Sequence, residues 1–379
     1  MMRAAAILVL AFAVSVPSLS HAQNSVYGVL GIGFVGRPIG TRARGMAGGL
    51  GAVDQGSAVN PAAIAAYRSV SVTGSIGTTL RSYTALGATA EGLKETRAPY
   101  AQLAGWIRGT PVSFALSYST YADRTYNLVT LDTISIGGDQ IEVADRIFSD
   151  GAVADVRGSL AARIGSWIGV GVGLHLLTGS AKAGAIRQFS NAAYLPAAEE
   201  VRLGFSGAGL SVGVLVVPSP RLTFAAAFRI DSRLETIADS VRISRIELPK
   251  TVTAGVTLFP HQVLQWATTV TYQTWSDAAG DLAAIGTVRA FDTWEVSSGI
   301  EIGGSGVSKI PLRLGFRYAQ LPFSPSDDQP RELAASLGSG IRFASDRARI
   351  EFSAERISRK GAGADEKAWY LTFSVTVRP

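Results

Sequence analysis

The run Trp369-Tyr370-Leu371-Thr372-Phe373-Ser374-Val375-Thr376-Val377 has large apolar side chains at its odd-numbered positions and Tyr, Thr or Ser between them. Successive side chains of a β-strand point to opposite faces, so this run predicts a strand with one apolar and one polar face. Residues 311–318 and 347–355 alternate in the same way. The chain is therefore expected to contain long strands with two different faces.

Alternation of this kind continues through most of the chain and gives about fourteen candidate strands, an even number typical of transmembrane barrels. The spans are 69–86, 99–107, 111–122, 151–164, 167–179, 199–217, 221–232, 249–259, 263–275, 293–302, 310–320, 332–343, 347–358 and 367–377. The predicted fold is all-β, a transmembrane antiparallel β-barrel.

The connections between these strands differ in length on the two sides of the sheet. After each even-numbered strand the connection is a short turn, as at 109–110, 218–220 and 260–262. Longer polar connections follow the odd-numbered strands, at 123–150, 180–198, 233–248, 276–292 and 321–331. Short periplasmic turns and long extracellular loops are typical of outer-membrane barrels.

The tryptophans give a second indication of a membrane barrel, because aromatic side chains gather at both membrane interfaces. On this threading Trp106, Trp167 and Trp266 lie near the turns, and Trp275, Trp294 and Trp369 lie near the loops. The alternative is that they are core tryptophans of a soluble β protein.

Three uncharged stretches are long enough to suggest a membrane-spanning helix, which needs about 20 apolar residues. Residues 164–181 have glycines at alternate positions, which is unfavourable in a helix. Residues 203–220 contain four glycines and end in Pro218-Ser219-Pro220. Residues 251–276 are interrupted at Pro260, so they indicate two strands and a turn. No membrane helix is expected after the leader.

The composition excludes several classes of protein. Of 379 residues, 47% are hydrophobic and only 17% are charged, against about 25% in a soluble domain. The chain has no cysteine, which excludes disulfide scaffolds and thiolate metal sites, and its three histidines argue against a multi-histidine metal site. Its basic residues are scattered singly, which is unlike a nucleic-acid surface. We expect no cofactor, no metal and no nucleic-acid partner.

The chain is expected to have three parts. Residues 1–22 have the basic start, apolar run and small-residue end of a secretory signal peptide. Residues 23–68 are rich in glycine and alanine without sustained alternation, and we expect them to form an N-terminal plug in the lumen. Residues 69–379 would form the barrel.

Three runs carry a resemblance to a known family. The N-terminal part contains a small-residue stretch at 44–49, then Asp54, then Asn60-Pro61-Ala62. Further runs lie at 248–256 and at 269–276. Through these runs the chain resembles the FadL-like family of long-chain fatty-acid outer-membrane transporters, and the resemblance covers the whole mature chain.

The resemblance implies a fourteen-stranded barrel in the outer membrane of a Gram-negative-type bacterium that carries hydrophobic small molecules passively. The ligand would be captured among the loops, enter a lumen pocket, displace the plug and leave sideways at a kinked third strand. The plug or gating residues would be Asn60, Pro61, Ala62 and Asp54. Phe189, Tyr194 and Leu195 are candidates for ligand capture.

The sequence departs from the family pattern in two places. It has Asp54-Gln55 where an acidic pair is common, and it ends in Val377-Arg378-Pro379 without a terminal aromatic residue. A related branch, the PorV-like barrels of type IX secretion, shares the N-terminal pattern. A structural barrel that works with secretion components is therefore the alternative function.

Two short motifs resemble catalytic or cofactor signatures but lie in the wrong context. The GxGxxG run at 31–36 lacks the preceding strand and following helix that a dinucleotide site needs. The GxSxG run at 209–213, which contains Ser211, lies inside a predicted strand, whereas a nucleophile elbow needs a strand-to-helix turn.

His175 falls on the inward face of its strand, and a lone inward histidine is more often a hydrogen-bonded lumen residue than a catalytic one. A triad would also need a nucleophile and an orienting group within reach. We therefore expect no catalytic residues and no enzyme. Other inward charges are of both signs, which indicates ion pairs around a plug; they are Arg229, Asp231, Glu295, Glu301, Arg313, Arg317, Arg349, Glu351 and Glu355.

Overall fold

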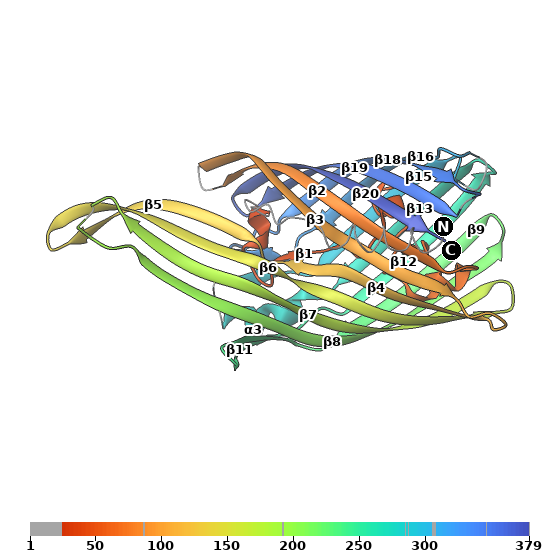
Figure 1. Cartoon of the computed structure of the whole chain (residues 1–379), viewed down its shortest axis with the longest axis horizontal. Helices are drawn as coiled ribbons and strands as arrows, with labels where there is room; N and C mark the ends of the chain where they lie inside the picture. The colour runs from red at the N-terminus through yellow and green to blue at the C-terminus, as the bar shows by residue number, and fades with distance from the viewer. Residues whose placement is uncertain are drawn as a thin grey trace.

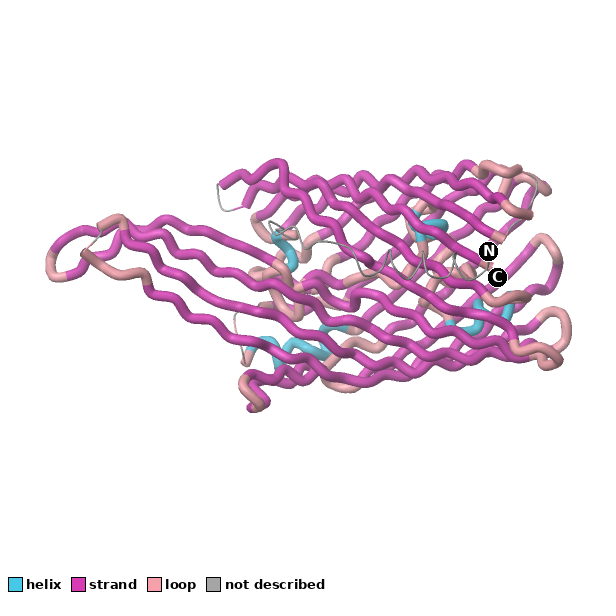
Figure 2. Tube along the Cα trace, viewed as in Figure 1, coloured by secondary structure: helices cyan, strands magenta, loops and turns pink. Residues whose placement is uncertain are grey.

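The computed structural model describes residues 25–85, 88–191, 193–284, 286, 288–304, 308–345 and 347–378, so the expected signal peptide lies outside the described residues. The helices are short pieces among long strands (Figure 2). They are η1 (Val26–Gly28), α2 (Thr41–Arg44), η2 (Pro61–Ala66), η3 (Trp275–Ala278) and α3 (Ala279–Ala283). None of the helices in these ranges has the length and apolar character needed to span a bilayer.

Fourteen antiparallel strands of the described chain close into a barrel (Figure 1). They are β2 (Ser71–Ala85), β3 (Ala88–Trp106), β4 (Val112–Asp123), β6 (Asp139–Ile164), β7 (Ile168–Phe189), β8 (Ala197–Ser219), β9 (Leu222–Asp231), β12 (Thr251–His261), β13 (Leu264–Gln273), β15 (Thr293–Ile302), β16 (Leu312–Gln320), β18 (Arg331–Phe343), β19 (Ala348–Gly361) and β20 (Ala364–Val377). The barrel closes where β2 pairs with β20, from Val72 opposite Val377 to Ala85 opposite Ala364. The barrel and its strand number predicted from alternation are confirmed.

The main difference from the sequence prediction lies in the two longest connections. Within 123–150, β5 (Tyr126–Ile136) pairs with the start of β6, and β7 continues to Phe189 where the prediction ended it at 179. The hairpin turns at Gly137 and Gly138, whose φ angles are +64° and +99°, values that only glycine adopts easily. These strands project beyond the barrel (Figure 1), where neither face needs to be apolar, so alternation gave no signal there.

A second hairpin occupies the predicted loop 233–248. It consists of β10 (Leu234–Ala238) and β11 (Val241–Ile246), and β10 also pairs with β8. Two further strands of two residues each, β14 (Arg289–Ala290) and β17 (Phe323–Ser324), pair with one another. The prediction that these connections are irregular loops is therefore wrong in part.

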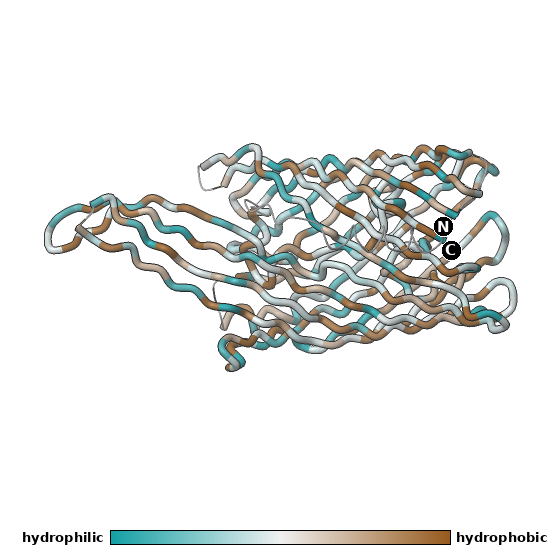
Figure 3. The backbone as a smooth tube through the Cα atoms, in the orientation of Figure 1, coloured by the Kyte–Doolittle hydropathy of each residue, from teal (hydrophilic) through white to brown (hydrophobic). Residues whose placement is uncertain are grey.

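The barrel is apolar outside and polar inside, the reverse of a soluble protein. Phe352 and Phe373 are exposed, whereas their neighbours Ser353 and Ser374 are buried in the lumen. Hydrophobic and hydrophilic residues are interspersed along the strands of the wall (Figure 3). An outward apolar band of this kind is stable only where the surroundings are apolar, as in a bilayer.

Four of the six tryptophans lie on the outer surface as predicted, and Trp106 is half-buried at the end of β3. Trp167, Trp266, Trp294 and Trp369 are exposed on the outer surface. Trp275 is fully buried instead and packs edge-on against Phe323, with ring centroids 5.0 Å apart. The reason is that β13 ends at Gln273, so Trp275 begins η3 and does not continue the strand.

Residues 25–70 lie inside the barrel and are bonded to its wall. Thr269 Oγ1 donates to the carbonyl of Gly49 over 2.8 Å, and Ser336 Oγ donates to that of Gly45 over 3.0 Å. Wall glycines permit this close approach: a Cβ at Gly315 would lie 2.2 Å from the backbone of Met46. The alternating glycines of the wall therefore provide room for the N-terminal segment.

The two faces of the wall predict different responses to a new charge. Phe352→Arg should destabilise the barrel in a bilayer by about 2–4 kcal/mol, because the guanidinium would face lipid. Thr79→Arg should cost much less, since Thr79 lines the lumen cavity among carboxylates. Reversible unfolding from lipid vesicles measures both. Equal losses for the two variants would contradict the assigned faces.

Candidate functional site

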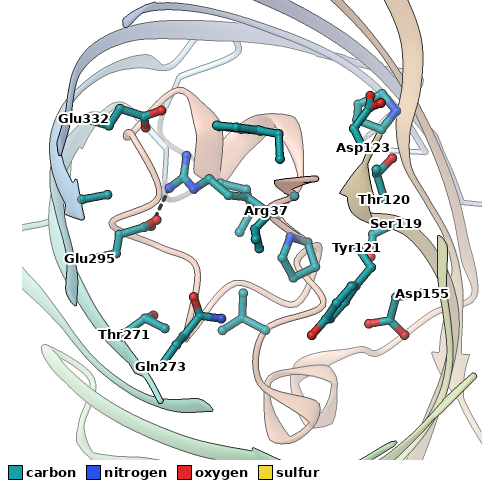
Figure 4. A pocket seen from close by; sticks show the side chains of 18 of the residues that line it. Arg37, Ser119, Thr120, Tyr121, Asp123, Asp155, Thr271, Gln273, Glu295 and Glu332 are labelled. Atoms are coloured by element: carbon teal, nitrogen blue, oxygen red, sulfur yellow. Dashed lines mark hydrogen bonds and ion pairs between the residues drawn. The ribbon is translucent and has the colours of Figure 1, made fainter. Parts of the chain in front are cut away.

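A cavity of about 310 Å³ lies in the lumen between the N-terminal segment and the inner wall (Figure 4). Phe34 to Ile39, together with Ala58 and Val59, form its inner side. The wall side is rich in charge of both signs. The charged lining consists of Arg37, Arg44, Arg81, Arg97, Arg229, Arg317, Arg359, Glu95, Asp123, Asp155, Asp231, Glu295, Glu332 and Glu355.

Several of these charges, together with Glu366, form a continuous belt of ion pairs across eight neighbouring strands, from β15 to β4. In order along the wall the belt is Glu295, Arg317, Glu332, Arg359, Glu366, Arg81, Glu95, Arg97 and Asp123. The Glu332–Arg359 contact is 2.6 Å, and the Arg97–Asp123 contact is 3.0 Å. Because the signs alternate, the charges largely compensate one another, as the mixed inward charges predicted.

Two arginines tie the N-terminal segment to this part of the wall. Arg37 contacts Glu295 at 2.9 Å and Glu355 at 3.7 Å, and Arg44 contacts Glu355 at 3.5 Å. Figure 4 shows Arg37 reaching across the cavity to Glu295. The sequence prediction missed these arginines, although their concentration at 37–44 in an otherwise small-residue segment was a usable signal.

Arg42 belongs to a second group of ion pairs, separate from the belt. It contacts Glu301 at 2.6 Å and Asp54 at 3.6 Å, and Glu301 also pairs with Arg313. Asp54 in addition accepts a hydrogen bond from Ser57 Oγ over 3.0 Å. The predicted gating residue Asp54 is thus held within the segment and connected to the wall through Arg42.

Asn60 makes three buried hydrogen bonds. Its Oδ1 accepts from Ala62 N over 2.9 Å and so caps η2, which begins at Pro61. Its Nδ2 donates to the carbonyls of Ala52 over 3.0 Å and of Val214, on β8, over 3.2 Å. The three predicted residues Asn60, Pro61 and Ala62 therefore act as one unit that attaches the segment to the wall.

The three predicted capture residues lie together at the far end of the projecting strands. Phe189 ends β7, and its ring centroid is 5.5 Å from that of Tyr194. Leu195 is 87% exposed. None of them lines the cavity described above, so the structure does not bring them to the same place as the lumen residues.

The wall is incompletely paired beside the cavity. The ladder between β3 and β4 ends where Tyr100 faces Ser119. Beyond that point, β1 (Phe34–Val35) of the N-terminal segment pairs with β4 at Ala122 and Asp123. Gly36 N adds a further bond to Tyr121 O over 2.8 Å. A strand from inside the barrel thus takes the place of β3 along this edge.

Side chains bridge the same break in the ladder. Arg97 of β3 forms an ion pair with Asp123 of β4. Two residues further along β3 is Pro99, which has no N–H to donate to a neighbouring strand. Arg97, Pro99 and Ser119 all line the cavity. The cavity therefore extends to the one place between β3 and β4 where backbone pairing has stopped.

His175 is not a lone histidine. Its Nδ1 lies 3.0 Å from both carboxylate oxygens of Asp155, and its Nε2 lies 2.9 Å from Ser211 Oγ. The three residues lie on the adjacent strands β6, β7 and β8, and all are buried. The sequence pattern points to His175 and Ser211 separately, and only the structure brings them together.

The two glycine motifs are placed as their sequence context predicted. The GxGxxG run contains β1 and does not open a helix, and Gly36 packs against the Thr120 carbonyl. The GxSxG run lies within β8 without a strand-to-helix turn. Neither forms the local structure that its motif requires.

Comparison with known proteins supports the fold. No family model and no curated protein sequence matches the chain. Among solved structures, a FadL homologue of Pseudomonas aeruginosa matches at 15% identity with a TM-score of 0.61, covering 91% of this chain and 99% of that one. The Ralstonia pickettii toluene transporter TbuX matches at 14% identity with a TM-score of 0.63, covering 90% and 98%.

A third structure, the CymD monoaromatic hydrocarbon channel, matches at 15% identity with a TM-score of 0.57, covering 92% of this chain and 99% of that one. All three matches extend over nearly the full length of both chains. The resemblance to the FadL-like family stated from the sequence is confirmed for the fold.

Proposed function

We propose that this chain is an outer-membrane transporter of the FadL-like type, which carries hydrophobic small molecules passively across the outer membrane. The observation that carries the proposal is the lumen cavity that reaches the break between β3 and β4, where β1 of the N-terminal segment fills the wall. Two of the structural neighbours are a toluene transporter and a monoaromatic hydrocarbon channel, which agrees with it.

The proposed route begins at the projecting strands, which would face the cell exterior. Phe189, Tyr194 and Leu195 would capture an apolar compound there and pass it to the lumen. Residues 25–70 act as the plug, and their displacement opens the cavity. The ligand then leaves sideways between β3 and β4 into the membrane, so that it never has to cross a polar pore.

The charged lining is compatible with an apolar ligand because the charges already have partners. A buried charge is unfavourable mainly when it lacks one. Val35, Pro38 and Ile39 supply apolar contacts on the plug side of the same cavity. The transport step proposed here involves no chemical reaction.

Uptake of a radiolabelled hydrophobic compound tests this function. Cells that lack their own FadL-like proteins are compared with and without this protein at a measured surface level. Faster uptake of a long-chain fatty acid or a monoaromatic compound supports transport. Uptake equal to that of the empty cells, together with copurification of large secretion components, would instead favour the PorV-like role.

The plug predicts the effect of a double substitution. Asn60→Ala with Pro61→Ala removes three buried hydrogen bonds and the rigid start of η2, and an unpaired buried group costs about 1–3 kcal/mol. The barrel should stay folded while the plug loosens, so that uptake of a hydrophobic probe changes severalfold. The control is Asn127→Ala on β5, whose side chain bonds only Arg146 of the projecting strands among the contacts described. Unchanged uptake across chemically different probes would rule out gating by this unit.

A further inference from the structure

We propose that Ser211, His175 and Asp155 form a hydrolytic site that cleaves carboxylic esters with an apolar body. This activity is separate from transport and needs a small ester to enter the lumen cavity and reach Ser211 beside it. Serine hydrolysis requires a nucleophile bonded to a histidine that a carboxylate orients. The distances of 2.9 Å and 3.0 Å reported above fulfil both contacts.

The register of the barrel assembles the three groups diagonally. His175 lies on β7, between β6 and β8. It is directly opposite Arg157 on β6 and Gly209 on β8. Asp155 and Ser211 each lie two residues from those positions, on the lumen face. Lumen side chains two residues apart on a neighbouring strand are within reach of long or aromatic side chains, so the imidazole spans from one to the other.

The carboxylate is held in place by a further ion pair. Arg229 Nη1 lies 2.6 Å from Asp155 Oδ2, and Arg229 Nε lies 2.8 Å from Asp231. Asp155 therefore keeps both oxygens directed at His175 Nδ1, the arrangement that leaves Nε2 free to accept the proton of Ser211. A histidine that served packing alone would not need a carboxylate fixed by an arginine.

Unused donors border the nucleophile. A Cβ at Gly173 would lie 2.6 Å from Ser211 Oγ and 3.3 Å from Arg157 Cδ, so both side chains meet over this glycine. Arg157 is 1% exposed, and within the described chain its Nε and Nη2 have no hydrogen-bond partner. A buried guanidinium without a carboxylate is costly and is suited to stabilise a negative charge that develops nearby. We assign Arg157 as the donor to the oxyanion.

The cavity provides the approach to this site. His175 and Asp155 line it, as do Ala58 and Val59 of the plug. Arg157 Nη1 donates to the Ala58 carbonyl, so the plug covers the Ser211 side of the cluster. Ser211 is 2% exposed in this closed arrangement. Movement of the plug at residues 58–60 therefore admits the ester to the nucleophile.

The reaction consumes one water and needs no other reagent. Ser211 Oγ attacks the ester carbonyl carbon while its proton passes to His175 Nε2, and the carbonyl oxygen becomes the oxyanion beside Arg157. The C–O bond to the alcohol then breaks, and His175 returns the proton to the leaving alcohol. Water, deprotonated by His175, attacks the acyl–Ser211 ester, and the carboxylic acid leaves as Ser211 regains its proton.

A fluorophosphonate probe tests the site on the purified full-length barrel in detergent. The probe forms a phosphorus–oxygen bond with an activated serine and releases fluoride. We expect one label, located on Ser211 by peptide mass spectrometry, and hydrolysis of p-nitrophenyl butyrate by the same preparation. Ser211→Ala should lose both, and His175→Ala should slow both by about 10³-fold or more. The Asn60→Ala variant should be labelled faster than the wild type.

The controls separate chemistry from folding and from uptake. Ser353→Ala removes another buried lumen serine, which bonds Thr372 and lies away from the cluster, and should leave labelling unchanged. The shift in gel mobility on heating verifies that each variant is a folded barrel. Failure of transport would leave the labelling intact. No label on Ser211 in either the wild type or Asn60→Ala, or labelling that His175→Ala does not reduce, would overturn the proposal.

Discussion

Replacing Glu301 by glutamine will lower the free energy of unfolding of the barrel by about 1.5–3 kcal/mol, because the change removes the buried carboxylate that Arg42 and Arg313 share and leaves these cations with Asp54 and Glu351. Glu301 is fully buried between two arginines. It accepts from Arg42 Nε over 3.0 Å and from Nη2 over 2.6 Å, and it also pairs with Arg313. The shape of the side chain is kept in glutamine, so the loss measures the charge.

Reversible unfolding by guanidinium in lipid vesicles gives this free energy. Glu200→Gln is the matched control, since Glu200 pairs with Lys182 at 2.8 Å on the projecting strands, where both side chains are about half exposed. An exposed pair of this kind contributes little. If the two variants lost equal stability, the network around Glu301 would have no special role in holding the plug to the wall.

The alternation in the sequence was enough to predict the number of strands and the direction of most side chains. Its physical cause is strong: one face meets lipid and the other meets a polar lumen, so each strand carries the period of two along its length. Where that cause ends, the prediction ended too. β5 and the outer part of β7 lie beyond the barrel, where lipid and lumen no longer impose the alternation, so the sequence predicts loops there.

The site was harder to predict because its residues come from different strands. Ser211, His175 and Asp155 become neighbours only through the register of three strands, and a single strand's pattern does not contain that register. His175 was noted for its inward phase and Ser211 for a motif that the fold does not use. The information that joins them is the pairing register of β6, β7 and β8.

The N-terminal segment shows the same division between local and long-range information. The resemblance to the family motif points to Asn60-Pro61-Ala62 within a single short run, and the structure gives Asn60 three hydrogen bonds to backbone groups. Arg37, by contrast, depends on Glu295 and Glu355, which lie hundreds of residues away in the chain. The sequence shows the charged residues of the N-terminal segment and of the wall, but it does not show which of them form pairs.

A disulfide between β1 and β4 should abolish transport. Gly36 N donates to Tyr121 O, so the preceding pair, Val35 and Ala122, is a pair without mutual backbone hydrogen bonds, in which the side chains lie close together. The chain has no cysteine, so Val35→Cys with Ala122→Cys introduces a single possible bridge. The bridge would fix the plug strand across the break beside β3.

Oxidation of this variant should reduce uptake of a hydrophobic compound to the level of cells without the protein, and a reductant should restore it. The proposed route requires β1 to leave β4, and a covalent bond prevents that at no cost to the folded barrel. The control bridge is Thr78→Cys with Thr96→Cys, which joins β2 and β3 where their hydroxyl oxygens are 3.0 Å apart and where the wall stays paired. Oxidation should leave its uptake unchanged. Full uptake through a completely bridged Val35–Ala122 pair would mean that the ligand leaves by another path, since no movement of β1 would then be needed.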